Sequence, residues 1–214
     1  MGFDVGSEIQ AAGIVAIVRL DDLSAAVPLA EALLAGGVKA IEFTYTNPLA
    51  GRAIEEVRGA LGERALCGAG SVLDAETARA ALLAGAQFLV TPVVAEDVIA
   101  VGNRYGAPTV IGAFTPTEIL RAWQAGATFV KVFPASVGGP RYLKDVLGPL
   151  PQVKLIPTGG VSESNAADFL RAGAAAIAVG SNLVDAKPVA ASDWATLTAR
   201  AERLVRAVRE VRED

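Results

Sequence analysis

The stretch Ala125-Gly126-Ala127-Thr128-Phe129-Val130-Lys131-Val132-Phe133-Pro134 contains the pattern that repeats along this chain. A small residue, a glycine and a second small residue end a helix, because glycine accepts the left-handed backbone of a helix C-terminus. A short run of aromatic and β-branched residues follows, which is typical of a strand buried on both faces. The small-glycine-small pattern recurs at 35–37, 84–86 and 172–174. The repeat indicates a series of helices that each lead into a buried strand.

Eight expected strands alternate with eight expected helices. The strands are expected at 13–19, 40–45, 65–68, 88–91, 109–111, 128–133, 154–157 and 176–180, and the helices at 23–35, 49–61, 75–83, 95–105, 116–124, 140–147, 164–171 and 192–211. Helix N-caps are expected at Asp74, at Thr115 with Glu118 three residues on, and at Ser162.

The spacing of these units decides between two α/β architectures. Eight strands, each followed by a helix and spaced about 20–25 residues apart, predict a single-domain (β/α)8 TIM barrel that occupies residues 1–214. An open, doubly wound sheet would also alternate in this way. No Gly-x-Gly-x-x-Gly motif opens a helix after the first strand, and this weakens a dinucleotide-binding version of such a sheet. The strand count favours the barrel.

The composition excludes several classes of chemistry and partner. The chain has no histidine and one cysteine, Cys67, so a histidine base, a histidine-containing metal site and an intrachain disulfide are excluded, and we expect no metal. The net charge of −4 gives no sign of a nucleic-acid partner. The apolar segments are too short for a membrane span. The start, Met1-Gly2-Phe3-Asp4-Val5-Gly6-Ser7-Glu8, lacks the basic and apolar regions of a signal peptide, so none is expected. We therefore expect a cytoplasmic protein without a membrane partner.

Lys131 stands alone among apolar strand residues. Burial disfavours the charged ammonium and lowers the pKa of such a lysine, which would leave a neutral amine able to attack a ketone and form a Schiff base. Alternatively, the side chain could extend along the strand and reach solvent with its charged end. The segment by itself leaves both interpretations open.

Two further strands carry a charged residue near the carboxyl end, where the chemistry of such a barrel lies. Because side chains alternate along a strand, Arg19 shares a face with Val15 and Ile17, Glu42 shares one with Ala40 and Thr44, and Lys131 shares one with Phe129 and Phe133. Charges inside a barrel should be either paired or functional. A salt-bridge cluster of Glu42 with Arg19 or Lys131 is the alternative to a catalytic site.

Glycine-rich loops follow several of the expected strands. Pro157-Thr158-Gly159-Gly160-Val161-Ser162 follows the seventh, and Val179-Gly180-Ser181-Asn182 follows the eighth. Loops at these two places commonly bind phosphate in such barrels, because glycine lets backbone N–H groups approach an anion. In Gly68-Ala69-Gly70-Ser71, after the third strand, the hydroxyl could face the centre or could form a local turn.

Five segments together resemble one enzyme family. They are Ile41-Glu42-Phe43-Thr44, Gly68-Ala69-Gly70-Ser71-Val72-Leu73, Thr91-Pro92, Phe129-Val130-Lys131-Val132-Phe133-Pro134 and Pro157-Thr158-Gly159-Gly160-Val161. In register from about residue 13 to residue 185, the chain resembles the 2-keto-3-deoxy-6-phosphogluconate (KDPG) and 4-hydroxy-2-oxoglutarate (KHG) aldolases. The resemblance implies a metal-free class I aldolase without a cofactor, assembled as a homotrimer. Such an enzyme splits the keto-acid sugar phosphate into pyruvate and glyceraldehyde 3-phosphate, within the Entner–Doudoroff route of carbohydrate metabolism.

The same resemblance implies a role for each matching residue. Lys131 would be the Schiff-base lysine and Glu42 the proton shuttle. The pyruvate and its carboxylate would be held by Arg19, Thr44, Ser71, Thr91, Pro92 and Phe133. The phosphate would be held by Gly159, Gly160, Gly180 and Ser181.

Two positions depart from the family pattern. Some members have an arginine in the pattern Glu-x-Thr-x-Arg where this chain has Thr46, and the residue after Gly-Ala-Gly is usually threonine but here is Ser71. The first departure bears on substrate identity, so the galactonate epimer of KDPG and unphosphorylated 4-hydroxy-2-oxoglutarate stay open as alternatives. Another phosphate-binding barrel, such as an isomerase or a thiamin-pathway enzyme, would not explain Lys131. An oligomeric scaffold built on the same barrel is the alternative of another class, since the apolar helix face at 25–34 could either pack or form an interface.

Overall fold

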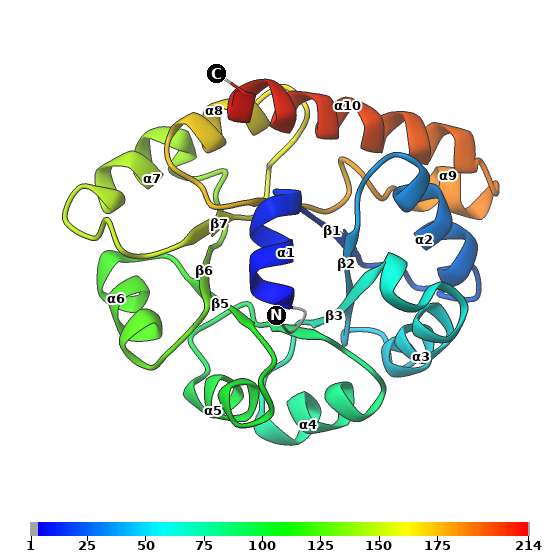
Figure 1. Cartoon of the computed structure of the whole chain (residues 1–214), viewed down its shortest axis with the longest axis horizontal. Helices are drawn as coiled ribbons and strands as arrows, with labels where there is room; N and C mark the ends of the chain where they lie inside the picture. The colour runs from blue at the N-terminus through cyan, green and yellow to red at the C-terminus, as the bar shows by residue number, and fades with distance from the viewer. Residues whose placement is uncertain (1–3, 214) are drawn as a thin grey trace.

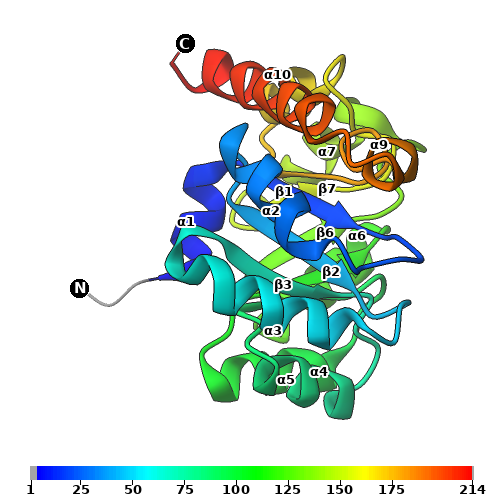
Figure 2. The same ribbon diagram turned by 90° about the vertical axis from the view of Figure 1, so that its right-hand side faces the viewer.

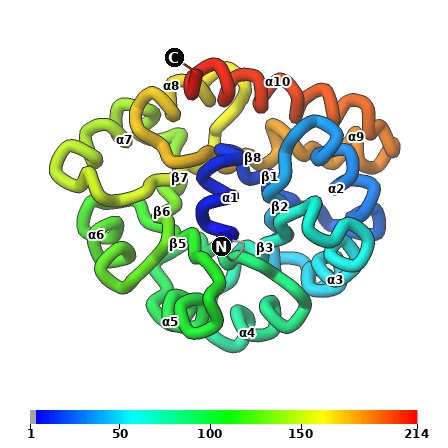
Figure 3. Tube along the Cα trace, in the orientation of Figure 1, coloured from blue at the N-terminus to red at the C-terminus, as the bar shows by residue number. Residues whose placement is uncertain are grey.

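The computed structural model describes residues 4–213, which fold as one domain of eight parallel strands surrounded by helices (Figure 1). Each strand pairs with its neighbours in the chain, and β1 also pairs with β8 (Figure 3). An isolated parallel bridge between Thr158 and Ala178 joins β7 to β8 and so connects the two edges of the sheet. The strands are β1 (Ile14–Val18), β2 (Ala40–Thr44), β3 (Leu66–Gly70), β4 (Phe88–Val90), β5 (Thr109–Ala113), β6 (Phe129–Val132), β7 (Leu155–Pro157) and β8 (Ile177–Val179). The predicted TIM barrel is confirmed.

All eight expected helices are present; those expected at 75–83 and 116–124 have the predicted bounds, and the other six are shifted at one or both ends. They are α2 (Ala26–Ala35), α3 (Ala50–Leu61), α4 (Ala75–Leu83), α5 (Glu96–Tyr105), α6 (Pro116–Gln124), α7 (Gly139–Leu147), α8 (Ala166–Arg171) and α10 (Trp194–Glu213). No helix among residues 4–213 is both long and apolar enough to cross a membrane. The domain bounds of 1–214 stay a prediction, because Met1-Gly2-Phe3, for which no signal peptide was expected, and residue 214 lie outside the described residues.

Two of the three expected N-caps are confirmed. The Asp74 carboxylate accepts a hydrogen bond from the Thr77 amide, and Thr115 forms a capping box with Glu118. The cap expected at Ser162 is wrong: Ser162 begins a turn, and α8 starts only after Asn165. Likewise α10 cannot start at Ser192, whose φ of 53° is left-handed.

The barrel has two apolar layers, as alternation along the strands predicts. One cluster fills the interior and includes Val15, Ile17, Ala40 and Phe129. The other lies between the strands and the helices and includes Ala16, Val18 and most of the apolar residues of α2. Helix α2 packs against α3 and α10. Its apolar face at 25–34 therefore serves packing within the chain.

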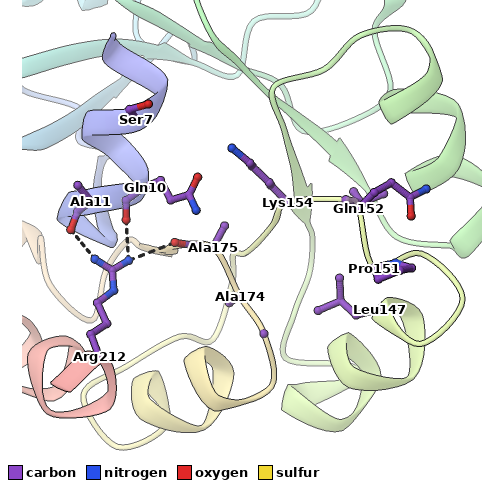
Figure 4. A pocket seen from close by; sticks show the side chains of 12 residues that line it. Ser7, Gln10, Ala11, Leu147, Pro151, Gln152, Lys154, Ala174, Ala175 and Arg212 are labelled. Atoms are coloured by element: carbon purple, nitrogen blue, oxygen red, sulfur yellow. Dashed lines mark hydrogen bonds between the residues drawn. The ribbon is translucent and has the colours of Figure 1, made fainter. Parts of the chain in front are cut away.

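A helix that the sequence did not indicate, α1 (Val5–Ala12), closes the amino-terminal end of the barrel (Figures 1 and 2). Ile9 of α1 is fully buried in the interior cluster. Arg212 from α10 donates hydrogen bonds to the carbonyl oxygens of Gln10, at 2.6 Å, and Ala175, at 3.2 Å, and to that of Ala11 (Figure 4). Two further short elements were not predicted from the sequence: α9 (Ala186–Ala190) and a 3₁₀ turn at Gly62–Arg64.

Candidate active site

Lys131 of β6 and Glu42 of β2 lie inside the barrel, as predicted from their strand faces. Their exposed fractions are 3% and 1%, respectively. Lys131 is paired in register with Gly112 of β5, and Glu42 with Ile17 of β1. Neither carboxylate oxygen of Glu42 has a hydrogen-bond partner among residues 4–213. The carboxylate is therefore not satisfied by a salt-bridge cluster with Arg19 or Lys131.

Burial dominates the electrostatics of both groups. It raises the pKa of Glu42, while the positive charges of Lys131 and Arg19 act in the opposite direction. It lowers the pKa of Lys131, and Arg19 lowers that pKa further, although Glu42 opposes both. The Lys131 Nζ lies 5.3 Å from the centre of the Phe133 ring. A buried lysine with a lowered pKa fits the free-amine interpretation of the sequence and not the solvent-reaching one.

Gly70 makes the space that the Glu42 carboxylate occupies. A Cβ atom at this position would collide with the Oε1, Cδ and Cγ atoms of Glu42, and the two residues lie on paired strands. Because any larger residue would displace the carboxylate, the Gly-Ala-Gly segment has a steric role that the sequence analysis did not identify. The signal was present in the alternation, which puts residue 70 on the interior face of β3.

A cavity of about 270 Å³ lies at the carboxyl ends of the strands. Its lining includes all four residues predicted to bind phosphate, together with Arg19 and Phe133 of the predicted pyruvate site. Gly159 and Gly160 have φ angles of 87° and 78°, so only glycine adopts this backbone without strain. The structure thus brings these predicted residues together around one pocket. The remaining lining residues, which the sequence analysis did not select, are Ile17, Thr158, Val161, Asn182 and Val184.

Two asparagines shape the loop after β7. The Nδ2 of Asn165 donates to the Gly160 carbonyl at 3.0 Å, and its Oδ1 accepts from the Ser162 amide at 2.8 Å. The Nδ2 of Asn182, in the loop after β8, donates to the Val161 carbonyl at 2.8 Å. Alternation along the strands could have identified Ile17 and Thr158. No sequence signal marks an asparagine that bridges two loops.

The hydroxyls of Thr44 and Thr91 form hydrogen bonds with backbone groups of the protein. Thr91 is fully buried; its Oγ1 donates to the Val93 carbonyl at 2.6 Å and accepts from the Gly112 amide at 2.9 Å. The Oγ1 of Thr44 is 3.3 Å from the Val18 carbonyl, to which it donates. Both threonines hold neighbouring strands and turns together, and their contact with a substrate stays a prediction.

Ser71 and Pro92 also lie outside the lining of the 270 Å³ cavity. Ser71 has a left-handed φ of 56°, directly after β3. Pro92 packs so closely on β5 that a Cβ at Gly112 would collide with its backbone. Their predicted roles in binding pyruvate stay predictions as well.

A larger hollow, of about 910 Å³, lies at the other end of the barrel between α1, Lys154 and Arg212 (Figure 4). Lys154 is exposed, and the Arg212 guanidinium donates to three backbone carbonyls. None of the predicted site residues lines this hollow. Volume alone therefore does not distinguish the cavity that contains the predicted site residues.

Comparison with known proteins gives one consistent result. The family model "KDPG and KHG aldolase" matches residues 5–200. The chain is 35% identical to 2-dehydro-3-deoxy-phosphogluconate aldolase of Treponema pallidum (strain Nichols), over 91% of this chain and 93% of that protein. It is 36% identical to 2-dehydro-3-deoxy-6-phosphogalactonate aldolase of Escherichia coli (strain K12), over 71% of this chain and 75% of that protein.

A solved structure agrees with these matches. The KDPG aldolase from Legionella pneumophila, with pyruvate captured as a covalent carbinolamine intermediate, superposes with a TM-score of 0.86 at 29% identity. The superposition covers 93% of this chain and 97% of that one.

Proposed function

The chain belongs to the KDPG and KHG aldolase family, and we propose that it is a class I aldolase that cleaves 2-keto-3-deoxy-6-phosphogluconate to pyruvate and glyceraldehyde 3-phosphate. One observation carries the proposal: a buried lysine and a buried glutamate without a hydrogen-bond partner share the barrel interior, beside a glycine-lined pocket. Leaving such groups buried costs stability, and this cost is typical of a catalytic site.

In the proposed mechanism the Lys131 amine attacks the C2 carbonyl carbon of the keto acid. Loss of water from the resulting carbinolamine leaves an iminium group, whose positive charge accepts the electron pair of the C3–C4 bond when that bond breaks. The aldehyde fragment leaves as glyceraldehyde 3-phosphate, and a pyruvate enamine stays on the lysine. Protonation at C3 and hydrolysis release pyruvate and restore the free amine.

Glu42 moves protons in this sequence. Its raised pKa lets it hold a proton at the start, give that proton to the departing water, and then, as a carboxylate, take the proton of the C4 hydroxyl. Since neither of its oxygens is engaged in residues 4–213, both are free to contact a substrate.

Arg19 and the glycine loops would bind the anionic ends of the substrate. A guanidinium offers a planar, two-pronged donor that suits a carboxylate or a phosphate. Gly159, Gly160, Gly180 and Ser181 line the same pocket as Arg19, and this arrangement suits a phosphate. Phe133 would pack against the three-carbon pyruvate unit, since it lines this pocket and its ring centre is 5.3 Å from the Lys131 Nζ.

A panel of three substrates tests the proposed substrate. Pyruvate release is measured with 2-keto-3-deoxy-6-phosphogluconate, its galactonate epimer and 4-hydroxy-2-oxoglutarate, with Lys131→Met as the inactive control. We expect the highest kcat/KM for the gluconate compound. A higher value for the epimer or for the unphosphorylated acid would replace the proposed substrate by that alternative, and no release from any of the three would reject the aldolase.

We also propose a cytoplasmic homotrimer that works in the Entner–Doudoroff route. Exposed apolar side chains in the loops after neighbouring strands β3 and β4, Leu73 and Val93, suit association with further copies of the chain. Sedimentation equilibrium tests this: a monomer at micromolar concentration would reject the trimer. The alternative, an oligomeric scaffold without activity, is the weaker proposal, because the chain retains both Lys131 and Glu42.

A further inference from the structure

A buried asparagine ties together the loops that follow β1 and β2. Asn47 is only 8% exposed and lies three residues beyond the end of β2. Its Nδ2 donates to the carbonyl oxygens of Leu20, at 3.0 Å, and Asp21, at 2.9 Å. Its Oδ1 accepts from the Leu49 amide at 2.8 Å. Both protons of the amide nitrogen are therefore used on one loop, while the oxygen is used on the other.

These hydrogen bonds lie next to Arg19 in the chain. Strand β1 ends at Val18, so Arg19 itself is outside the sheet pairing. On one side of Arg19, the Val18 carbonyl accepts from Thr44, and on the other side the Leu20 carbonyl accepts from Asn47. The backbone on both sides of Arg19 is thereby attached to β2 and its loop, and Arg19 itself lines the cavity.

We propose that Asn47 is a positioning residue that acts through Arg19, holding its backbone so that the guanidinium lies in the anion pocket. The inference rests on the proposed function in one respect, namely that Arg19 binds an anionic group of the substrate. No other uncharged side chain of similar size supplies two donors and one acceptor from a single planar group, apart from glutamine, which is one methylene longer. An ordered loop lowers the conformational cost of binding, because a long arginine is then already near its bound position.

The test is a double-mutant cycle between Asn47→Ala and Arg19→Ala, read by steady-state kinetics with 2-keto-3-deoxy-6-phosphogluconate. In the otherwise unchanged protein we expect Asn47→Ala to raise KM by roughly 5- to 20-fold, with kcat altered much less. In the Arg19→Ala background the same substitution should alter KM by less than about 2-fold, because the group through which it acts is gone. If the alanine variant folds poorly, Asn47→Asp replaces it in the same cycle. This variant keeps the acceptor for the Leu49 amide and loses both donors, so the same pattern of KM changes is expected.

Asn103→Ala is the matched control. The Nδ2 of Asn103 also donates to a loop carbonyl, that of Gly126 at 3.3 Å, but at the amino-terminal end of the barrel. We expect this variant to keep its KM. The pyruvate concentration that gives half-maximal borohydride trapping is measured in the unchanged protein and in Arg19→Ala. Pyruvate has a carboxylate and no phosphate, so a higher concentration in Arg19→Ala shows that Arg19 binds the carboxylate, and an equal one shows that it binds the phosphate.

Two outcomes overturn the inference. If Asn47→Ala changes KM by the same factor in the unchanged protein and in Arg19→Ala, Asn47 stabilises the loops without acting through Arg19. The role of Arg19 and the proposed function would then stand. An unchanged KM in Arg19→Ala would show that Arg19 does not bind an anionic group of the substrate. The inference about Asn47 would then be rejected as well.

Discussion

Charged side chains at the two ends of the barrel lie in opposite environments. At the amino-terminal end, α1 inserts Ile9 into the interior, and Arg212 donates to three backbone carbonyls. At the carboxyl end, both oxygens of Glu42 are buried without a partner in residues 4–213, and Lys131 is only 3% exposed. Satisfied groups stabilise a fold, whereas unsatisfied buried groups cost free energy. Contacts that stabilise the fold and the proposed catalytic groups therefore lie at different ends of this molecule.

The largest expected effect is the loss of activity in Lys131→Met. Removing the nucleophile should lower kcat/KM by more than about 10⁴-fold, because Lys131 is the only buried lysine among residues 4–213. The melting temperature should not fall, since a buried amine is replaced by an apolar chain of similar length. Lys154→Met is the control: Lys154 lies at the amino-terminal end, exposed, and its loss should leave kcat/KM unchanged. Comparable losses of kcat/KM in Lys131→Met and Lys154→Met would contradict the difference between the two ends.

Glu42→Gln should give the second-largest loss of activity. The amide keeps the shape of the side chain but cannot accept and return a proton, so kcat should fall by roughly 10²–10⁴-fold with the fold retained. The measurement is pyruvate release together with a circular dichroism melt. Turnover close to that of the unchanged protein would remove Glu42 from the mechanism.

Ile9→Ala probes the opposite end. Truncating a fully buried side chain in the interior cluster should lower the free energy of unfolding by about 2–5 kcal/mol. Because α1 is remote from the pocket, kcat/KM at a temperature where the variant is folded should stay within about 2-fold, the scatter expected for distant sites. Urea titration and kinetics on the same preparation check both parts. A large kinetic loss would mean that the two ends are coupled.

The raised pKa of Glu42 predicts a pH dependence of stability. Above the ordinary value of 4.5, an unfolded chain releases the Glu42 proton while the folded protein still holds it. The free energy of unfolding that Glu42 contributes is therefore fully present below that value and is lost as pH rises through the folded pKa. The difference between the unchanged protein and Glu42→Gln should fall with rising pH in urea titrations. A difference that grows with pH would indicate a carboxylate stabilised by ion pairing instead.

The smallest expected effect belongs to Arg212→Met. The guanidinium is exposed, so losing its three carbonyl contacts should cost only about 1 kcal/mol of unfolding free energy. Kinetics should not change. The paired variant Arg19→Ala should behave in the opposite way, with a raised KM and an unchanged melting temperature. Matching effects in the two arginine variants would contradict the division between the ends.

Local sequence patterns predicted the strands, eight of the helices and the interior positions of Lys131 and Glu42, because alternation along a strand is a local property. They did not predict α1, a short helix whose only strong signal, Ile9, acquires meaning when the barrel closes around it. They also did not predict that Thr44 and Thr91 direct their hydroxyls at backbone atoms, or that Asn47 joins two loops. Such contacts join residues about 20 or more positions apart or depend on a turn, so only the assembled barrel determines them.

Borohydride trapping with pyruvate tests the central claim, that Lys131 is a neutral, nucleophilic amine, most directly. The folded protein is incubated with excess pyruvate, reduced, digested and analysed by peptide mass spectrometry, with Lys131→Met and Lys154→Met treated in parallel. A pyruvate-derived adduct on the peptide that contains Lys131, present in the Lys154→Met variant and absent from Lys131→Met, is the predicted result. No adduct on the folded protein, or an adduct on a different lysine, would contradict the Schiff-base mechanism.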